Sequence, residues 1–169
     1  CSRLVACSAL AIPLPAVPAF FAAAAFAVHL AVAGFLVSER MAQAWPDRFQ
    51  RILFAFGYVL LPNAYETFVN LTNAQWHLAI LAFLILFAGR PRSWVGWTFD
   101  AVVLGIASVS GPFSLFLAPI ALWQAHAARS PSSILRAAII LAGAAVQAGL
   151  VITGFAAERP DAALGASPG

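Results

Sequence analysis

The chain contains no lysine, and charged residues of any kind are scarce in it. Arginine and acidic residues together make up 9% of its 169 residues, whereas hydrophobic residues make up 63%. Soluble domains carry about 25% charged and about 45–50% apolar residues. The composition therefore excludes a water-soluble globule and a disordered chain. It predicts an all-α fold, a polytopic helical bundle embedded in a lipid bilayer.

Cysteine is also scarce, and metal-ligating residues form no recognisable pattern. Cys1 and Cys7, the only two cysteines, lie in an apolar stretch and support no disulfide framework. The spacing of His, Cys and acidic residues predicts no metal site, and no motif indicates a cofactor. The net charge of +3 is scattered over the loops, so nucleic acid is not an expected partner. Because the chain starts with Cys rather than Met, we expect residues 1–155 to belong to a larger membrane domain, with a flexible polar tail at 156–169.

Six apolar runs are candidate membrane segments. A spanning helix needs about 20 apolar residues, or about 30 Å at 1.5 Å per residue. Residues 16–37 meet this length, residues 137–155 nearly do, and residues 78–88 form a third span when extended back through His77 and Trp76. The other three runs reach only about 15–20 Å; they are residues 52–61, 97–109 and 113–125. We therefore expect six membrane segments, some of them short or broken.

The arginines indicate an orientation for these segments. Seven of the nine fall on alternate connections: Arg40, Arg48, Arg51, Arg90, Arg92, Arg129 and Arg136. The intervening connections, residues 62–75 and 110–112, contain none, which is the positive-inside pattern. These two connections should face outwards. Arginine without lysine, in an alanine-rich chain, is associated with GC-rich bacterial genomes, so we expect a bacterial plasma membrane.

The segment 62–77 is the most polar part of the chain and holds one acid, Glu66. Pro62 either ends the helix that begins near Ile52 or kinks it. In both cases Glu66 lies in or beside a water-filled pocket, because ionisable groups and irregular backbone at membrane depth need such surroundings. The alternative is a solvated loop acid with no role.

A second polar connection, residues 108–114, joins the fourth and fifth runs. Gly111 permits a sharp turn, and Pro112 suits the first turn of the next helix. The alternative is an ordinary tight turn without a function. Since both polar connections face outwards, we predict a depression open to the outer face. Its walls would carry Glu66, Asn70, Asn73, Trp76, His77 and Ser110.

Two other polar residues lie within apolar runs. His29 is in the middle of the first run, where packing between helices is favoured over a role as a ligand. Asp100 is near the inner end of the fourth run, where we expect it at the cytoplasmic interface.

Two stretches of the chain resemble a pattern in uncharacterised bacterial multi-spanning membrane proteins. They are Asn-Leu-Thr-Asn-Ala-Gln-Trp-His-Leu at 70–78 and Ser-Gly-Pro-Phe at 110–113. Those proteins are similar to GT-C-class glycosyltransferases, which use polyprenyl-phosphate sugars. The resemblance covers residues 60–123. The GT-C class places a catalytic acid, often one of a pair, on an early extracytoplasmic loop. Here Glu66 is the sole acid on an outer connection between spans, so the pair is absent.

The resemblance implies a transferase that acts on a lipid-linked sugar at the outer face of the bilayer. Glu66 would be the base towards an acceptor hydroxyl. The sugar or phosphate would be held by Asn70, Asn73, Trp76 and His77. Two alternatives remain open. One is a transporter or flippase that uses the same outer pocket. The other is a non-catalytic membrane scaffold in which the polar groups of the two outer connections only satisfy one another's hydrogen bonds.

Overall fold

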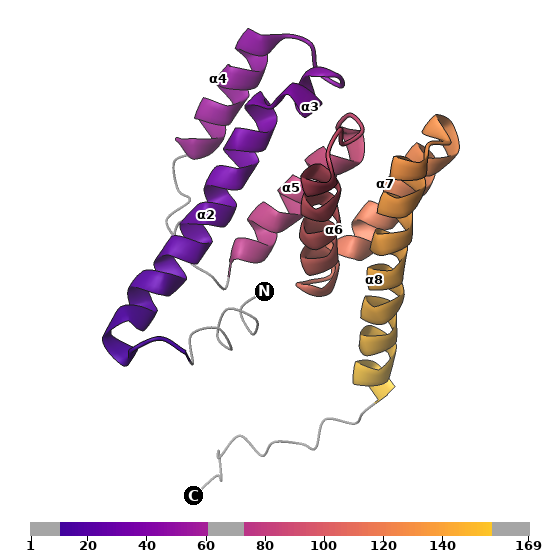
Figure 1. Cartoon of the computed structure of the whole chain (residues 1–169). Helices are drawn as coiled ribbons and strands as arrows, with labels where there is room; N and C mark the ends of the chain where they lie inside the picture. The colour runs from indigo at the N-terminus through magenta and orange to yellow at the C-terminus, as the bar shows by residue number, and fades with distance from the viewer. Residues whose placement is uncertain (1–10, 61–72, 157–169) are drawn as a thin grey trace, which may run out of the picture.

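The computed structural model describes residues 11–60 and 73–156, and every regular element in these two stretches is a helix (Figure 1). Glu66, Asn70 and the tail from residue 157 lie outside the described residues. The elements are η1 (Leu14–Ala16), α2 (Val17–Val37), α3 (Glu39–Ala42), α4 (Arg48–Val59), α5 (Ala74–Phe87), α6 (Trp94–Val109), α7 (Phe113–Ala128) and α8 (Pro131–Ala156). The all-α fold class is thus confirmed.

Each of the six apolar runs corresponds to one helix, but four helices begin earlier than expected: α4, α5, α6 and α8. Helix α4 begins at Arg48 rather than at residue 52, because Asp47 Oδ1 accepts a hydrogen bond from the Gln50 N–H at 3.0 Å and caps it. Helix α8 begins at Pro131 rather than at residue 137. The four-residue α3 was not predicted; Ser38 Oγ accepts a hydrogen bond from the Met41 N–H, which starts this turn.

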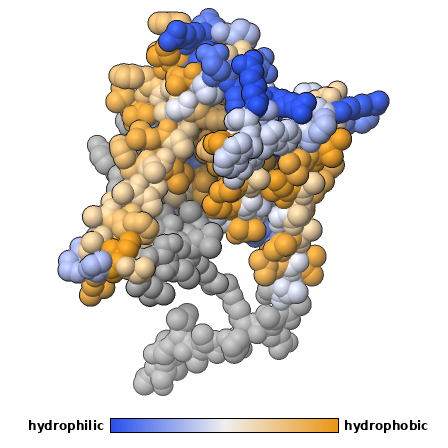
Figure 2. Space-filling model, in the orientation of Figure 1, coloured by the Kyte–Doolittle hydropathy of each residue, from blue (hydrophilic) through white to orange (hydrophobic). Residues whose placement is uncertain are grey.

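The helices alternate in direction, so the connections that carry arginine gather at one end of the bundle (Figure 1). On the face that Figure 2 shows, hydrophilic residues cover this end and hydrophobic residues cover most of the surface below it. We call it the arginine end, and its arginines are Arg40, Arg48, Arg51, Arg90, Arg92, Arg129 and Arg136.

Buried aliphatic side chains of several helices form one core. Leu81 and Ile85 of α5 are at most 1% exposed and pack with Val32 of α2, Leu104 of α6 and Ile140 of α8. Many large hydrophobic side chains nevertheless lie on the outside, among them Phe49, Phe56, Phe116, Trp123 and Ile152. Among the described residues, two stretches are long and apolar enough to cross a membrane, Leu14–Val37 and Pro131–Thr153.

Small residues let α6 and α8 approach closely. Gly143 lies against Ser108, and a Cβ added at Gly143 would collide with the Ser108 side chain and come within 3.1 Å of its carbonyl oxygen. Gly149, two turns further along α8, has nothing within 4 Å of such a Cβ. The alanine and glycine stretch around Gly143 therefore serves helix packing.

The helices differ in length in a way that shapes the far end of the bundle. Helix α2 has 21 residues and α8 has 26, or about 32 Å and about 39 Å. Helices α5, α6 and α7 have 14, 16 and 16 residues, or about 21–24 Å. All of them have one end at the arginine end, so α5, α6 and α7 stop short of the far ends of α2 and α8 (Figure 1).

Candidate functional site

The described part of the predicted site lies at the ends of α5 and α6 that are remote from the arginines. Asn73 is the half-buried residue that precedes α5, and Ser110 follows α6. The hydroxyl of Ser110 donates a hydrogen bond of 2.6 Å to the carbonyl oxygen of Ile106, one turn earlier.

The two stretches that carry the GT-C resemblance meet in space. The Trp76 ring packs edge-on against the Phe113 ring, with 4.7 Å between the ring centroids. The Gln75 side chain lies against Gly111, where an added Cβ would approach Gln75 Oε1 to 2.9 Å. Trp76 remains 52% exposed, so one side of its ring faces outwards from the bundle.

His77 does not lie beside Trp76 on the surface, because successive helical residues point in different directions. It is 6% exposed and faces the bundle interior. Its Nδ1 and the hydroxyl oxygen of Tyr58 form a hydrogen bond of 2.5 Å. The His29 ring stacks on Tyr58 at 4.8 Å and meets the edge of His77 at 4.6 Å. We call these three residues the His–Tyr–His cluster.

The His–Tyr–His cluster lies about half-way along the bundle. His29 is eight residues from the end of α2, Tyr58 is ten from the start of α4, and His77 is ten from the end of α5. These separations place the cluster about 12–15 Å from the arginine end. A phenol hydrogen-bonded to an imidazole can pass a proton in either direction, according to the imidazole tautomer.

A charged cluster at the arginine end was not recognised in the sequence. Asp100, 3% exposed, accepts hydrogen bonds of 2.7 Å from both Nη atoms of Arg40. Arg136 donates to the same carboxylate from Nε at 3.1 Å, with its Nη2 at 2.9 Å. Asp100 was expected at the cytoplasmic interface and Arg136 in the connection before the last run. A lone acid within an apolar run was the available signal, because such a residue needs a partner.

The Arg40–Asp100–Arg136 cluster also binds the backbone that joins α5 to α6. Arg136 donates to the carbonyl oxygens of Ala88 at 2.8 Å and Gly89 at 3.1 Å, and Arg40 Nε donates to Gly89 at 3.3 Å. These bonds satisfy carbonyl groups at the end of α5 and connect α3, α6 and α8. The cluster therefore has a structural role, because it links three helices to the connection between α5 and α6.

Arg51 was expected in a connection but lies in α4, where it is 4% exposed. Its Nη1 donates to the carbonyl oxygens of Leu36 at 3.3 Å and Ser38 at 2.8 Å, at the end of α2 where the helix dipole favours a cation. None of the described carboxylates forms an ion pair with it. The seven arginines of this end face three acids (Glu39, Asp47 and Asp100), so positive charge is in excess.

Within residues 11–60 and 73–156, no group of three His, Cys, Asp or Glu residues is placed to hold a metal ion. No protein-family model matches the chain, and neither a curated protein nor a solved structure shows significant similarity to it. The candidate site therefore rests on its own geometry.

Proposed function

We propose that the chain is embedded in a bacterial plasma membrane with its arginine end in the cytoplasm. The exposed apolar sides, the two long apolar helices and the gathering of arginines at one end support this placement. In that position the far ends of α5, α6 and α7 would lie below the outer surface of the bilayer.

At this outer side, we propose a GT-C-like glycosyl transfer from a polyprenyl-phosphate sugar. The observation that carries the proposal is the Trp76–Phe113 ring pair, which joins the described part of the first stretch (residues 73–78) to residues 110–113. An exposed indole ring offers an apolar face on which a sugar ring can stack. A donor anchored in the bilayer reaches such a site from the lipid.

The proposed step moves one sugar and one proton. The acceptor hydroxyl oxygen bonds to the anomeric carbon, and the bond between that carbon and the phosphate oxygen breaks. Glu66 takes the hydroxyl proton as general base, and polyprenyl phosphate leaves with the electron pair. Asn70 and Asn73 would hold the donor beside Trp76, while His77 supports the site from within the bundle.

The test compares two Glu→Gln variants of the full chain in membranes. The membranes are supplied with polyprenyl-phosphate glucose, and its glucose is radiolabelled. Glu66→Gln should lower sugar transfer by about 100-fold or more, because a positioned general base contributes that much. Glu39→Gln, an exposed acid at the opposite end, should keep full transfer. Equal transfer by Glu66→Gln and the unmodified chain would remove Glu66 from the mechanism.

The His–Tyr–His cluster favours a second candidate, a proton-coupled transporter. Transporter sites lie near the middle of the bilayer, and ionisable residues at that depth mark proton pathways. A transporter in proteoliposomes would accumulate labelled sugar without transferring it to an acceptor, and Tyr58→Phe would abolish the accumulation. A non-catalytic scaffold would show neither activity.

A further inference from the structure

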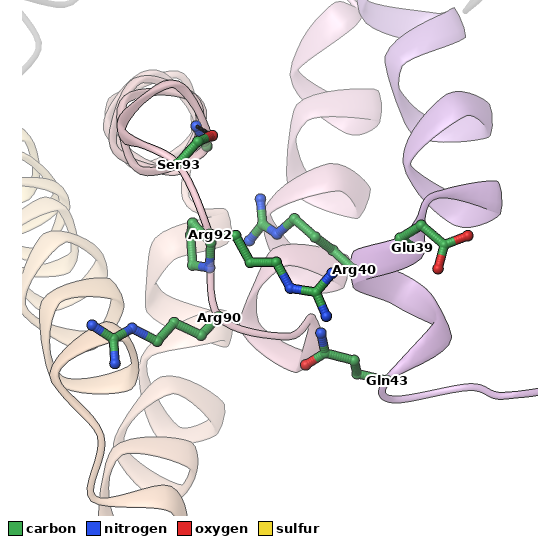
Figure 3. Close-up of a pocket in the computed structure, with 8 residues that line it drawn as sticks. Glu39, Arg40, Gln43, Arg90, Arg92 and Ser93 are labelled. Atoms are coloured by element: carbon green, nitrogen blue, oxygen red, sulfur yellow. Dashed lines mark hydrogen bonds between the residues drawn. The ribbon is translucent and has the colours of Figure 1, made fainter.

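A cavity of about 180 Å³ lies at the arginine end, between α3 and the connection from α5 to α6 (Figure 3). Its walls include Glu39, Arg40, Gln43, Arg90, Arg92 and Ser93. A shallow, open depression beside it shares Gln43, Arg90 and Arg92 and adds Trp97. One water needs about 10–15 Å³ of such volume, so the cavity accommodates a phosphate group.

The cavity is positively charged because two of its arginines have no acidic partner. Arg40 is paired with Asp100, but neither Arg90 nor Arg92 forms an ion pair with any described carboxylate. Arg92 extends towards Gln43, whereas Glu39 points its carboxylate away from the arginines (Figure 3). An anion in this cavity would meet the Arg92 guanidinium and the Gln43 amide, while the Arg90 side chain points to the other side of the connection (Figure 3). Guanidinium groups match phosphate oxygens in geometry.

The backbone around the cavity is held in place before any ligand arrives. The Gly89 N–H donates to the Arg40 carbonyl oxygen at 3.0 Å, and a Cβ at Gly89 would collide with Gln43. Ser93 Oγ accepts a hydrogen bond from the Gly96 N–H and fixes the start of α6. Preformed walls reduce the entropic cost of binding.

The surroundings of the cavity are those of a headgroup layer. The Arg90 guanidinium lies over the Trp97 ring, 5.8 Å from its centroid, and Trp94, at the start of the same helix, is 77% exposed. Tryptophan is enriched at membrane interfaces, and basic pockets between helices on the cytoplasmic side bind anionic headgroups.

We infer that this cavity binds the phosphate group of an anionic membrane lipid through Arg92 and Gln43, with Arg90 attracting the same headgroup from the neighbouring depression. The acyl chains of that lipid extend along the exposed apolar sides of the bundle. The inference rests on the proposed membrane placement and not on glycosyl transfer, which would occur at the opposite end.

The test measures phosphatidylglycerol binding to the full chain, purified in detergent, by native mass spectrometry. The double variant R90Q/R92Q should raise the dissociation constant about tenfold or more, since each such cation contributes about 1 kcal/mol to binding of anionic lipid. The matched control R48Q/R129Q removes two exposed arginines of the same end that do not line the cavity. It should stay within about twofold of the unmodified chain.

Three results would overturn the inference. Equal weakening by the two double variants would show diffuse attraction by net charge, and no weakening by R90Q/R92Q would show that the lipid binds elsewhere. Displacement of the lipid by millimolar inorganic phosphate would assign the cavity to a free anion. Sedimentation of the chain with membranes after alkaline extraction tests the placement separately, so failure of the lipid site and failure of membrane placement are distinguishable.

Discussion

Replacing Asp100 by Asn tests how much the Arg40–Asp100–Arg136 cluster stabilises the bundle. The substitution keeps the shape of the side chain but removes the carboxylate that faces Arg40 and Arg136. Two guanidinium groups would then face each other across a neutral amide, and one amide hydrogen would point at a cation. We expect the chain to fold less stably, because removal of one partner leaves the remaining buried charges uncompensated.

The burial of each partner sets the size of the effect. The side chains of Arg136 and Asp100 are 6% and 5% exposed, so their pair is weakly screened. The Arg40 side chain is 19% exposed, and solvent compensates part of its charge. Breaking a buried pair costs about 3–5 kcal/mol, and we expect Asp100→Asn to lower the free energy of unfolding by about 3 kcal/mol, the lower part of that range.

Unfolding by sodium dodecyl sulfate in mild detergent, followed by circular dichroism, measures this loss. Asp47→Asn is the matched control, because Asp47 is exposed and caps α4, and Asn caps a helix equally well. Adding Arg136→Gln to Asp100→Asn should recover part of the loss, since it removes an uncompensated charge. A shift below about 1 kcal/mol for Asp100→Asn, or one equal to the shift of Asp47→Asn, would refute the reasoning.

Two further predictions concern the bundle interior. Gly143→Ala should lower the free energy of unfolding by about 1–3 kcal/mol, because its methyl group overpacks Ser108. Gly149→Ala should not lower it, and Ser108→Gly combined with Gly143→Ala should recover only part of the loss, because the contact with the backbone oxygen of residue 108 remains. Tyr58→Phe removes the hydrogen bond to His77 and should cost about 1–3 kcal/mol; an unchanged unfolding curve would show that this bond does not stabilise the bundle.

Helix positions were largely predictable because apolar runs and turn residues act locally. The end of α6 at Val109 and the start of α7 at Phe113 match the expected bounds, since Gly111 and Pro112 form the turn by their own chemistry. The polar first turns of α4 and α8 were missed because hydropathy does not distinguish them from a connection. For the same reason Arg51 and Arg136 were expected in connections but lie in helices.

The interior partners of polar residues were not predictable from one sequence. Asp100 pairs with Arg40 and Arg136, which are separated from it by 60 and 36 positions in the sequence. Only the packing of the helices brings these side chains together. The packing role expected for His29 agrees with its ring contacts to Tyr58 and His77, although Tyr58 was not recognised as a partner. Charge pattern thus predicted which residues share an end of the bundle, but not which side chains face inwards.

The central claim, a bundle across the membrane with its arginine end in the cytoplasm, is tested most directly by cysteine labelling. Ala64→Cys and Ala128→Cys are placed singly in a chain whose Cys1 and Cys7 are replaced by Ser, and intact spheroplasts are treated with a membrane-impermeant maleimide. Ala64 belongs to the connection that the sequence predicts to face outwards, and Ala128 ends α7 at the arginine end. We predict labelling of Ala64→Cys in intact spheroplasts and of Ala128→Cys only after permeabilisation. Labelling of both from outside would contradict the account.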